Sequence, residues 1–318
     1  MKSNQPIKEH ILPFLEYCEI EKGLSSNTQR NYKQYLDLFV KWLDKTNNSK
    51  LKPHELDRKH VWDYRLFLAQ RYKTNRDKFL TRKSQNYYLI AFRSFLDFLA
   101  DRDIDTLPSS KVKLAKQKTE ETISFLEVSD VEKMLEVPDI ATPQGIRDRT
   151  IMELLFSSGM RVSELVALDQ DQMSMLSDKK SDRTYELSIV GKGSKVRTIF
   201  ISPRAAKWIR EYLRTRRDVL NPLFINYRSK DPERKRLSPR SIQLMISKTA
   251  RLAGLSKKVT PHTLRHTYAT DLLGAGADLR SVQELLGHSN VATTQVYTHV
   301  TNKRLRDIHE KFHGKDEK

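Results

Sequence analysis

Cysteine is almost absent from this sequence, which has a single thiol, Cys18, among its 318 residues. One cysteine excludes a disulfide within the chain, so noncovalent packing must hold the fold, as is usual in a reducing compartment. No apolar run approaches the roughly 20 residues that a membrane-spanning helix needs, and the first residues lack the apolar core of a secretion signal. We therefore expect a cytoplasmic protein with no membrane partner, in which Cys18 is a buried thiol.

Acidic residues are also in short supply. The chain carries 40 Asp and Glu against 58 Lys and Arg, which gives a formal net charge of +18. Such an excess favours a polyanionic partner, with nucleic acid first and an anionic membrane surface second, although charge alone also fits a basic protein without such a partner. The length is sufficient for two domains, each with its own hydrophobic core.

Apolar residues recur at helical spacing through the first hundred positions. The pattern predicts a helix at about 7–18, a second capped by Ser26, a third capped by Asp57 and a fourth at about 81–99. Amphipathic helices with short connections are typical of a helical bundle. We predict such a bundle, as a first domain, for residues 1–108.

Basic residues are frequent on the predicted surface of this bundle. Among them, Lys33, Arg82 and Arg93 are candidates for contacts with the phosphates of a DNA duplex. The alternative is an ordinary solvated face, which is how many charged stretches behave. Apolar periodicity then fades over residues 109–122, where lysine and serine dominate, and we predict an exposed basic linker there.

Residues 123–300 predict a second domain that is mainly α-helical with a small antiparallel β-sheet. Alternating apolar residues predict a hairpin of strands 185–190 and 195–201 around a glycine-rich turn. Residues 129–132 resemble a helix-capping box, and a short strand is predicted at 223–225. The other predicted helices lie at about 147–157, 161–165, 203–217, 239–254, 262–273 and 278–286.

Several side chains in this second domain suit the handling of a phosphodiester. His262 and Arg265 are three residues apart, so one helical turn presents both on the same side. A guanidinium can hold two phosphate oxygens at once, and Arg161 follows a glycine turn and can hold the other side of the phosphate. Tyr297 offers a hydroxyl nucleophile, and Lys192, at the tip of the hairpin, can protonate a leaving oxygen.

Each of these residues has a simpler interpretation, and the residues alone leave both open. Arg161 can pair with Glu164 on its own helix. Lys192 can be an ordinary hairpin lysine, and Tyr297 can belong to the hydrophobic core. Their common order along the chain favours a joint catalytic role.

A metal site is not favoured. His262 and His266 have the spacing of a helical zinc pair, but the adjacent glutamate of such motifs is missing and Arg265 would repel the metal. We expect His266 to be structural, pointing away from the side that carries His262 and Arg265. The sequence predicts no metal and no cofactor.

The order of motifs resembles the tyrosine recombinase (phage integrase) family, and within it most of all the Xer-type site-specific recombinases. The similarity extends over nearly the whole chain and is most specific toward the C-terminal end. The segments that carry it are 159–165, 191–193, 260–266, 285–288 and Tyr297.

The resemblance implies roles for the residues at matching positions. Arg161 and Arg265 would clamp the scissile phosphate, and Glu164 would support the first of these arginines. His262 and His288 would position the phosphate and move protons.

The same resemblance implies the chemistry. Tyr297 would attack the phosphorus to form a 3′-phosphotyrosine, and Lys192 would be the general acid for the 5′-hydroxyl leaving group. Storing the phosphodiester energy in the protein–DNA link removes the need for ATP, and a cationic clamp can replace a divalent metal.

The resemblance also implies an architecture and partners. A SAM-like core-binding domain and a catalytic domain would form a C-shaped clamp on double-stranded DNA with a specific recombination site. Family members act as tetramers, here a homotetramer or a heterotetramer with a paralogue, and residues 301–318 are a candidate tail that docks on a neighbouring subunit. Arg240 and Lys248, on the helix that begins near residue 239, are candidates for groove contacts.

We therefore expect a cytoplasmic, nucleoid-associated enzyme that carries out Xer-like chromosome or plasmid dimer resolution, or integrase-like recombination. Two alternatives remain open at this point. One is a type IB topoisomerase-like enzyme that uses the same chemistry alone, and the other is a non-catalytic DNA-binding protein on the same fold.

Overall fold

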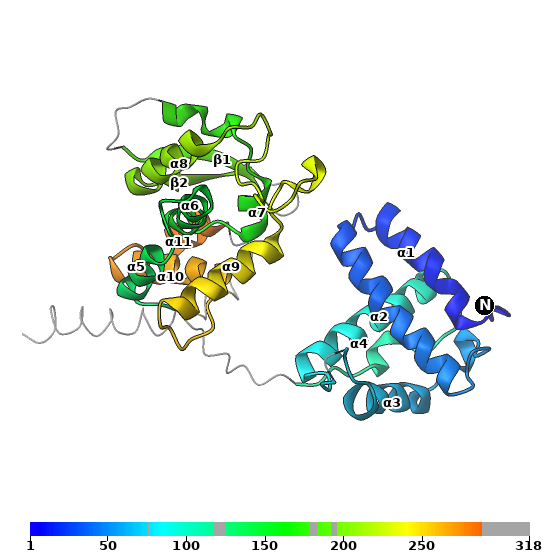
Figure 1. The fold of residues 1–318 in the computed structure, drawn as a ribbon. Coiled ribbons are helices and arrows are strands. Elements are labelled where there is room, and N and C mark those ends of the chain that lie inside the picture. Colours follow the sequence, from blue (N-terminus) through cyan, green and yellow to red (C-terminus); the bar gives the residue numbers. More distant parts are fainter. Residues whose placement is uncertain (76, 117–124, 178–182, 192–195, 288–318) are drawn as a thin grey trace, which may run out of the picture. The chain divides into compact units, whose positions relative to one another are not determined.

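The computed structural model divides the chain into two units, Met1–Glu121 and Thr122–Lys318, which are described separately (Figure 1). The structure describes residues 1–75, 77–116, 125–177, 183–191 and 196–287. Both units are mainly helical, and the second contains one two-stranded antiparallel sheet. The predicted fold class is thus confirmed. None of the helices in the described ranges is both long and apolar enough to cross a membrane.

In the described residues the first unit is built around four α-helices, and capping side chains fix the starts of the last three. Asp57 caps the third helix as predicted, accepting a hydrogen bond of 2.9 Å from the backbone N–H of His60. The predicted cap Ser26 is wrong by one residue, because the side chain of Ser25 accepts from the N–H of Thr28 instead. The helices are α1 (Ile11–Ile20), α2 (Ser26–Lys45), α3 (Arg58–Leu66) and α4 (Arg82–Asp101), with 3₁₀ turns at Ile7–His10, Pro53–Glu55 and Ser109–Lys111 and a π-helical turn at Phe67–Arg71.

Aromatic side chains form the centre of this unit. The ring of Phe39 lies 4.6 Å from that of Phe92 and 5.1 Å from that of Tyr64, between ring centroids. Such tilted and edge-on pairs add to the free energy gained from burying the rings. Cys18 is buried in the same core as expected, and burial raises the pKa of its thiol to about 11.

The segment that follows α4 packs onto the first unit, which differs from the exposed linker predicted from residue 109 onward. Val112 is buried in the core of the unit. The buried side chain of Asn86, on α4, donates to the carbonyl of Ala115 and accepts from its N–H, both at 2.9 Å. Lysines dominate the composition of this segment, which is why the sequence suggested an exposed linker. The burial of Val112 and the two hydrogen bonds between the Asn86 side chain and the backbone of Ala115 are sufficient to hold the chain. Residues 117–122 of the predicted linker lie outside the described residues.

The second unit is organised around α6, which packs against α5, α8, α10 and strand β2. Ile151, Leu154 and Leu155 of α6 are completely buried, as their spacing predicts. The helices are α5 (Val128–Glu136), α6 (Pro143–Ser158), α7 (Val162–Ala167), α8 (Pro203–Thr215), α9 (Pro239–Leu252), α10 (Pro261–Gly274) and α11 (Leu279–Leu286).

The sheet of this unit is the predicted hairpin. Strand β1 (Tyr185–Val190) pairs with β2 (Val196–Ile201) in an antiparallel register from Tyr185 opposite Ile201 to Val190 opposite Val196. The strand predicted at 223–225 is not found. Within the described residues that region forms only isolated bridges, Asp169 with Pro222 and Ile225 with Arg236.

The capping box predicted at residues 129–132 is wrong as well. Helix α5 begins at Val128, and the residue before it makes no side-chain cap. The carboxylate of Glu132 is taken instead by Arg204 at the start of α8, with N–O distances of 2.6 and 2.7 Å. A bidentate pair between charged groups is stronger than a hydrogen bond to the backbone, so a tertiary contact overrides the local motif.

Replacing Asn86 by alanine should loosen the segment around Ala115. The variant leaves the N–H and carbonyl of Ala115 without their partner, which should lower the free energy of unfolding by about 1–3 kcal/mol. We expect faster limited trypsin cleavage after Lys113 and Lys116, measured alongside urea denaturation. Asn31→Ala, at an exposed position of α2, is the matched control. Equal cleavage rates in the two variants would contradict the anchoring role of Asn86.

Candidate active site

A tight glycine turn brings Arg161 into position. Helix α6 ends at Gly159, whose φ of 58° lies in the left-handed region. A Cβ at this position would also lie only 2.3 Å from a ring carbon of Tyr268, so both the backbone conformation and the close packing require glycine. The chain then reverses into α7, and Arg161 occupies the position just before that helix.

Arg161 pairs with Glu164, as the simpler interpretation of the sequence proposed. Its guanidinium donates to Oε1 of Glu164 at 2.9 Å, and its backbone N–H donates to Oε2 at 2.7 Å. Burial alone would raise the pKa of Glu164, but hydrogen bonds from Arg161 and from Arg197 hold that pKa below its ordinary value. The carboxylate is therefore ionised. About one third of the Arg161 side chain remains exposed, so pairing does not exclude a phosphate.

Helix α10 supplies the second arginine. Thr260 caps this helix by accepting from the N–H of Thr263. Arg265 is only 4% exposed, and it donates to the carbonyl of Gly159 and to that of Leu286, both at 2.6 Å. These bonds compensate part of the cost of burying its charge and connect the turn after α6 to the end of α11.

The two histidines of α10 lie together, which contradicts the expectation that His266 points away. The rings of His262 and His266 meet edge to face with 4.4 Å between their centroids. Residues four apart stack along one side of a helix, so His266 belongs to the same neighbourhood as His262. Although His262 is an exposed residue, desolvation by the atoms around its ring lowers its pKa, and Arg265 and Arg161 lower that pKa further. His262 is therefore neutral at neutral pH.

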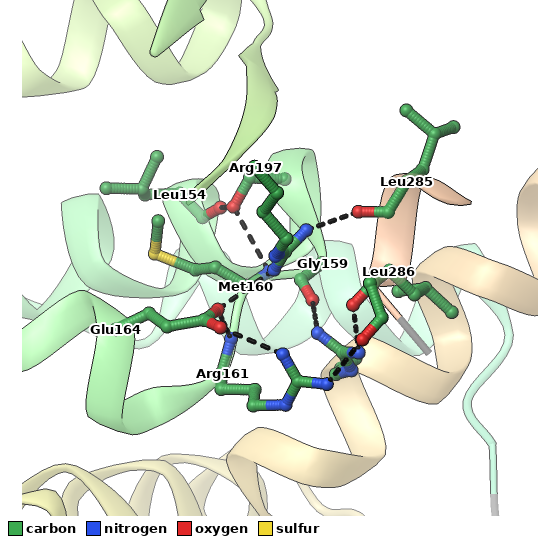
Figure 2. A network of polar contacts seen from close by, with 11 residues as sticks. Leu154, Gly159, Met160, Arg161, Glu164, Arg197, Leu285 and Leu286 are labelled. Atoms are coloured by element: carbon green, nitrogen blue, oxygen red, sulfur yellow. Dashed lines mark hydrogen bonds and ion pairs between the residues drawn. The ribbon is translucent and has the colours of Figure 1, made fainter. Parts of the chain in front are cut away.

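The end of α11 is where the arginines converge (Figure 2). Its last carbonyl oxygens each accept from a different guanidinium: Leu285 from Arg197, Leu286 from Arg265, and Gly287 from Arg161 at 3.0 Å. The C-terminal end of a helix carries partial negative charge. It therefore attracts and orients cations without a carboxylate for each of them.

Arg197 is the residue that the sequence reasoning missed. It lies on β2, and its side chain is 12% exposed and donates to Oε2 of Glu164 at 2.9 Å. The available signal was the single arginine, shortly after Lys192, in a return strand that is otherwise mostly apolar. The alternation of apolar and polar residues along the strand did not by itself distinguish Arg197 from the solvent-facing residues of the hairpin.

Arg161 and Arg265 line an open hollow of about 720 Å³. His262, Arg240 and Lys258 line the same hollow, and no carboxylate is found among its lining residues in the part of the chain that the structure describes. Four cations line the hollow and only Arg161 among them pairs with the ionised Glu164, an excess of positive charge that favours an anion in this space. Across the described residues, no three His, Cys, Asp or Glu side chains are grouped so that they could hold a metal ion.

The other predicted DNA contacts are scattered. Lys248, which shares α9 with Arg240, lines a different hollow together with Asp148. In the first unit, Lys33 is paired with Asp37 at 3.1 Å. There Arg82 is exposed and Arg93 is half-buried. Lys192, His288 and Tyr297 lie outside the described residues.

Comparisons with known proteins agree with this geometry. The model of the phage integrase family matches residues 124–304, and that of the phage integrase N-terminal SAM-like domain matches residues 11–103. The chain is 35% identical over 311 residues to tyrosine recombinase XerD of Listeria monocytogenes serovar 1/2a, a match that covers 95% of this chain and 98% of the relative. It is 36% identical over 320 residues to tyrosine recombinase XerC of Pelotomaculum thermopropionicum, covering 96% and 97%.

Solved structures share the fold. The XerH site-specific recombinase bound to its difH substrate superposes with a TM-score of 0.71 at 18% identity, covering 97% of this chain and 98% of that one. A lambda integrase tetramer bound to a Holliday junction gives a TM-score of 0.62 at 17% identity, covering 89% and 77%. The resemblance drawn from the sequence motifs is confirmed. The chain belongs to the phage integrase family of tyrosine recombinases, enzymes that cleave and rejoin DNA.

Proposed function

We propose that this protein is a site-specific DNA recombinase whose second unit cleaves and rejoins one DNA strand at a time. The observation that carries the proposal is the hollow lined by Arg161, Arg265 and His262 without a carboxylate. Two guanidiniums and a neutral imidazole are suited to a phosphodiester, whose negative charge increases as the phosphorus becomes five-coordinate. Family membership supplies the reaction class.

In the proposed reaction, the phenolic oxygen of Tyr297 forms a bond to phosphorus while the bond from phosphorus to the 5′ oxygen breaks. The phenolic proton passes to a histidine, His262 or His288. The 5′ oxygen takes a proton from Lys192 and leaves as a hydroxyl. The products are a 3′-phosphotyrosine and a free 5′-hydroxyl, and reversal of the step with a second strand rejoins the DNA. Bond energy is conserved throughout, so the reaction needs no nucleotide.

We further propose that DNA is held by both units. In this proposal Arg240 and Lys248 contact DNA from α9, and Lys33, Arg82 and Arg93 contact it from the first unit, which closes with the second as a clamp. Four subunits, identical or shared with a paralogue, would bring two duplexes together on chromosomal DNA in the cytoplasm, with residues 301–318 docking on a neighbour. The full-length similarity to XerD and XerC proteins favours dimer resolution over integration.

Two other functions share this chemistry or this fold. A type IB topoisomerase-like enzyme would relax supercoiled plasmids that lack a specific site. A non-catalytic DNA-binding protein would bind DNA but never form a covalent link to it. The retained Arg161, His262 and Arg265 favour catalysis, and one adduct experiment separates all three cases.

Replacing Tyr297 by phenylalanine should abolish covalent attachment to DNA and leave DNA binding intact. We expect the unmodified protein, incubated with fragmented genomic DNA of its source cell, to form adducts that survive denaturation and map to one short sequence. Adducts are counted after gel separation, and binding is measured by mobility shift. The phenyl ring keeps the shape of the side chain and removes only the nucleophile.

Three outcomes decide between the candidate functions. Adducts at one site that vanish in Tyr297→Phe support the recombinase. Adducts spread over unrelated sequences, with relaxation of any plasmid, support the topoisomerase-like alternative. Binding without any adduct from the unmodified protein supports the non-catalytic alternative, and adducts that persist in Tyr297→Phe sink the proposed mechanism.

Replacing Arg265 by lysine should impair cleavage far more than binding. The lysine keeps the charge but cannot donate to the carbonyls of Gly159 and Leu286 and to a phosphate from one planar group. We expect single-turnover cleavage of the mapped site to slow by about 10²–10³-fold, the range for loss of a donor to a developing oxyanion. The dissociation constant should stay nearly the same. Equal losses in both quantities would contradict a role specific to the transition state.

The neutral state of His262 can be tested by its pH dependence. Its pKa in the folded protein lies below the ordinary value of 6.5, so the unfolded chain takes up a proton at a higher pH than the folded one. The stability contributed by this group is therefore complete above pH 6.5 and declines as the pH falls from there through the folded-state pKa. We expect an NMR titration, assigned with His262→Gln, to place the His262 signal below 6.5, and the unfolding free energy of the variant to decline less over the same range. A His262 signal that titrates above 6.5 would refute the neutral imidazole.

A further inference from the structure

Arg197 joins three elements of the second unit, although it belongs to none of the motifs that identify the family. Its side chain leaves β2, donates to Glu164 on α7, and donates to the carbonyl of Leu285 at the end of α11. It also passes directly under Gly287, where an added Cβ would lie 2.7 Å from its Cδ. The close-up shows this side chain between Glu164 and Leu285 (Figure 2).

Arg197 shares Glu164 with Arg161, and it binds the same helix end as Arg161 and Arg265. Glu164 divides its two carboxylate oxygens between Arg161, at 2.9 Å, and Arg197, also at 2.9 Å. The carbonyl bound by Arg197 is adjacent in the chain to the one bound by Arg265, and the next carbonyl is bound by Arg161. Arg197 therefore binds one partner of Arg161, Glu164, and packs against the residue that carries the other, Gly287.

Arg197 itself does not line the hollow in which we propose the phosphate binds. Its side chain is 12% exposed against 34% for Arg161. Its effect on a phosphate must therefore pass through the groups it holds. Removing it would leave the carbonyl of Leu285 without this donor and Oε2 of Glu164 with only the backbone N–H of Arg161, so that the carboxylate would be free to shift and draw the Arg161 side chain out of place.

We propose that Arg197 is a positioning residue for the cleavage step, which sets the orientation of Arg161 through Glu164 and the end of α11. The inference rests on the proposed function, because it requires that Arg161 binds the scissile phosphate. It predicts that loss of Arg197 weakens charge stabilisation at the phosphorus and spares both DNA binding and the proton donor.

The test uses full-length protein and a nicked duplex that carries the site mapped from Tyr297 adducts, in three chemical forms. One has the natural phosphodiester, one a neutral methylphosphonate at the scissile position, and one a bridging sulfur in place of the 5′ oxygen. The methylphosphonate lacks the charge that Arg161 would neutralise. The sulfur leaves without a proton and so relieves only the general acid.

We expect Arg197→Met to cleave the phosphodiester about 10–100-fold more slowly than the unmodified protein, as is typical when a partner of a site residue is lost. The dissociation constant for DNA should be unchanged. The difference in cleavage rate between Arg197→Met and the unmodified protein should largely disappear with the methylphosphonate substrate and persist with the substrate that has the bridging sulfur. Arg197→Lys, which keeps the charge but cannot reach both partners with one planar group, should fall between them.

A second readout tests the route through Glu164. If Arg197 acts through that carboxylate, Arg197→Met combined with Glu164→Gln should slow cleavage by much less than the product of the two single effects. Multiplicative losses would contradict the route. A difference that is the same on all three substrates, or that closes only on the bridging sulfur, would overturn the assignment.

Arg216 provides the matched control for general destabilisation. Its side chain is 3% exposed and is held by Asp218 and by the carbonyls of its own loop. Arg216→Met should lower the melting temperature without a substrate-dependent difference in cleavage, and reproduction of the Arg197 pattern would refute the positioning role. Failure of the unmodified protein to cleave any of the substrates would instead refute the proposed function.

Discussion

The end of α11 is the point on which the site depends. A helix terminus ordinarily leaves its last carbonyls to water or to a cap. Here the carbonyls of Leu285, Leu286 and Gly287 accept from three different guanidiniums. The helix end, which carries no formal charge, thereby accepts hydrogen bonds from guanidiniums that lie close together and would otherwise repel one another. Gly287 must be glycine for this, since its φ is 64° and Arg197 lies against its α-carbon.

This arrangement holds the arginines in place and still leaves their positive charge available to a ligand. Carboxylates fix guanidiniums firmly but also cancel their charge. The second unit uses one ionised carboxylate, Glu164, for two arginines and relies on backbone dipoles for the remaining contacts, including those of Arg265. The local charge thus stays positive, and the hollow is left without an acid. An entering phosphate would complete the compensation, and in a partly desolvated site such a charge interaction is stronger than it would be in water.

The sequence predicted what depends on local periodicity and single-residue chemistry. The cap at Asp57, the two antiparallel strands of the hairpin and the proximity of His262 to Arg265 follow from such rules and were found. The convergence of Arg161 and Arg197 on one carboxylate could not be predicted, because it joins residues from different elements whose packing is decided by the whole core. His266 was misjudged since spacing of four residues was weighed for metal binding and not for ring stacking. The anchoring of Ala115 was hidden by the lysines around it.

The guanidiniums of the site also act on the pKa of nearby phenol groups, and Tyr268 shows how their effect compares with that of burial. Arg197 and Arg265 both favour its ionised form, yet burial outweighs them and the pKa of Tyr268 is raised. Cations alone therefore do not produce a phenolate where the ring is enclosed. A tyrosine nucleophile in this site must either stand open to the hollow or transfer its proton during attack. In the proposed reaction, the neutral His262 has a free nitrogen to receive that proton, and burial together with Arg265 and Arg161 keeps its pKa low.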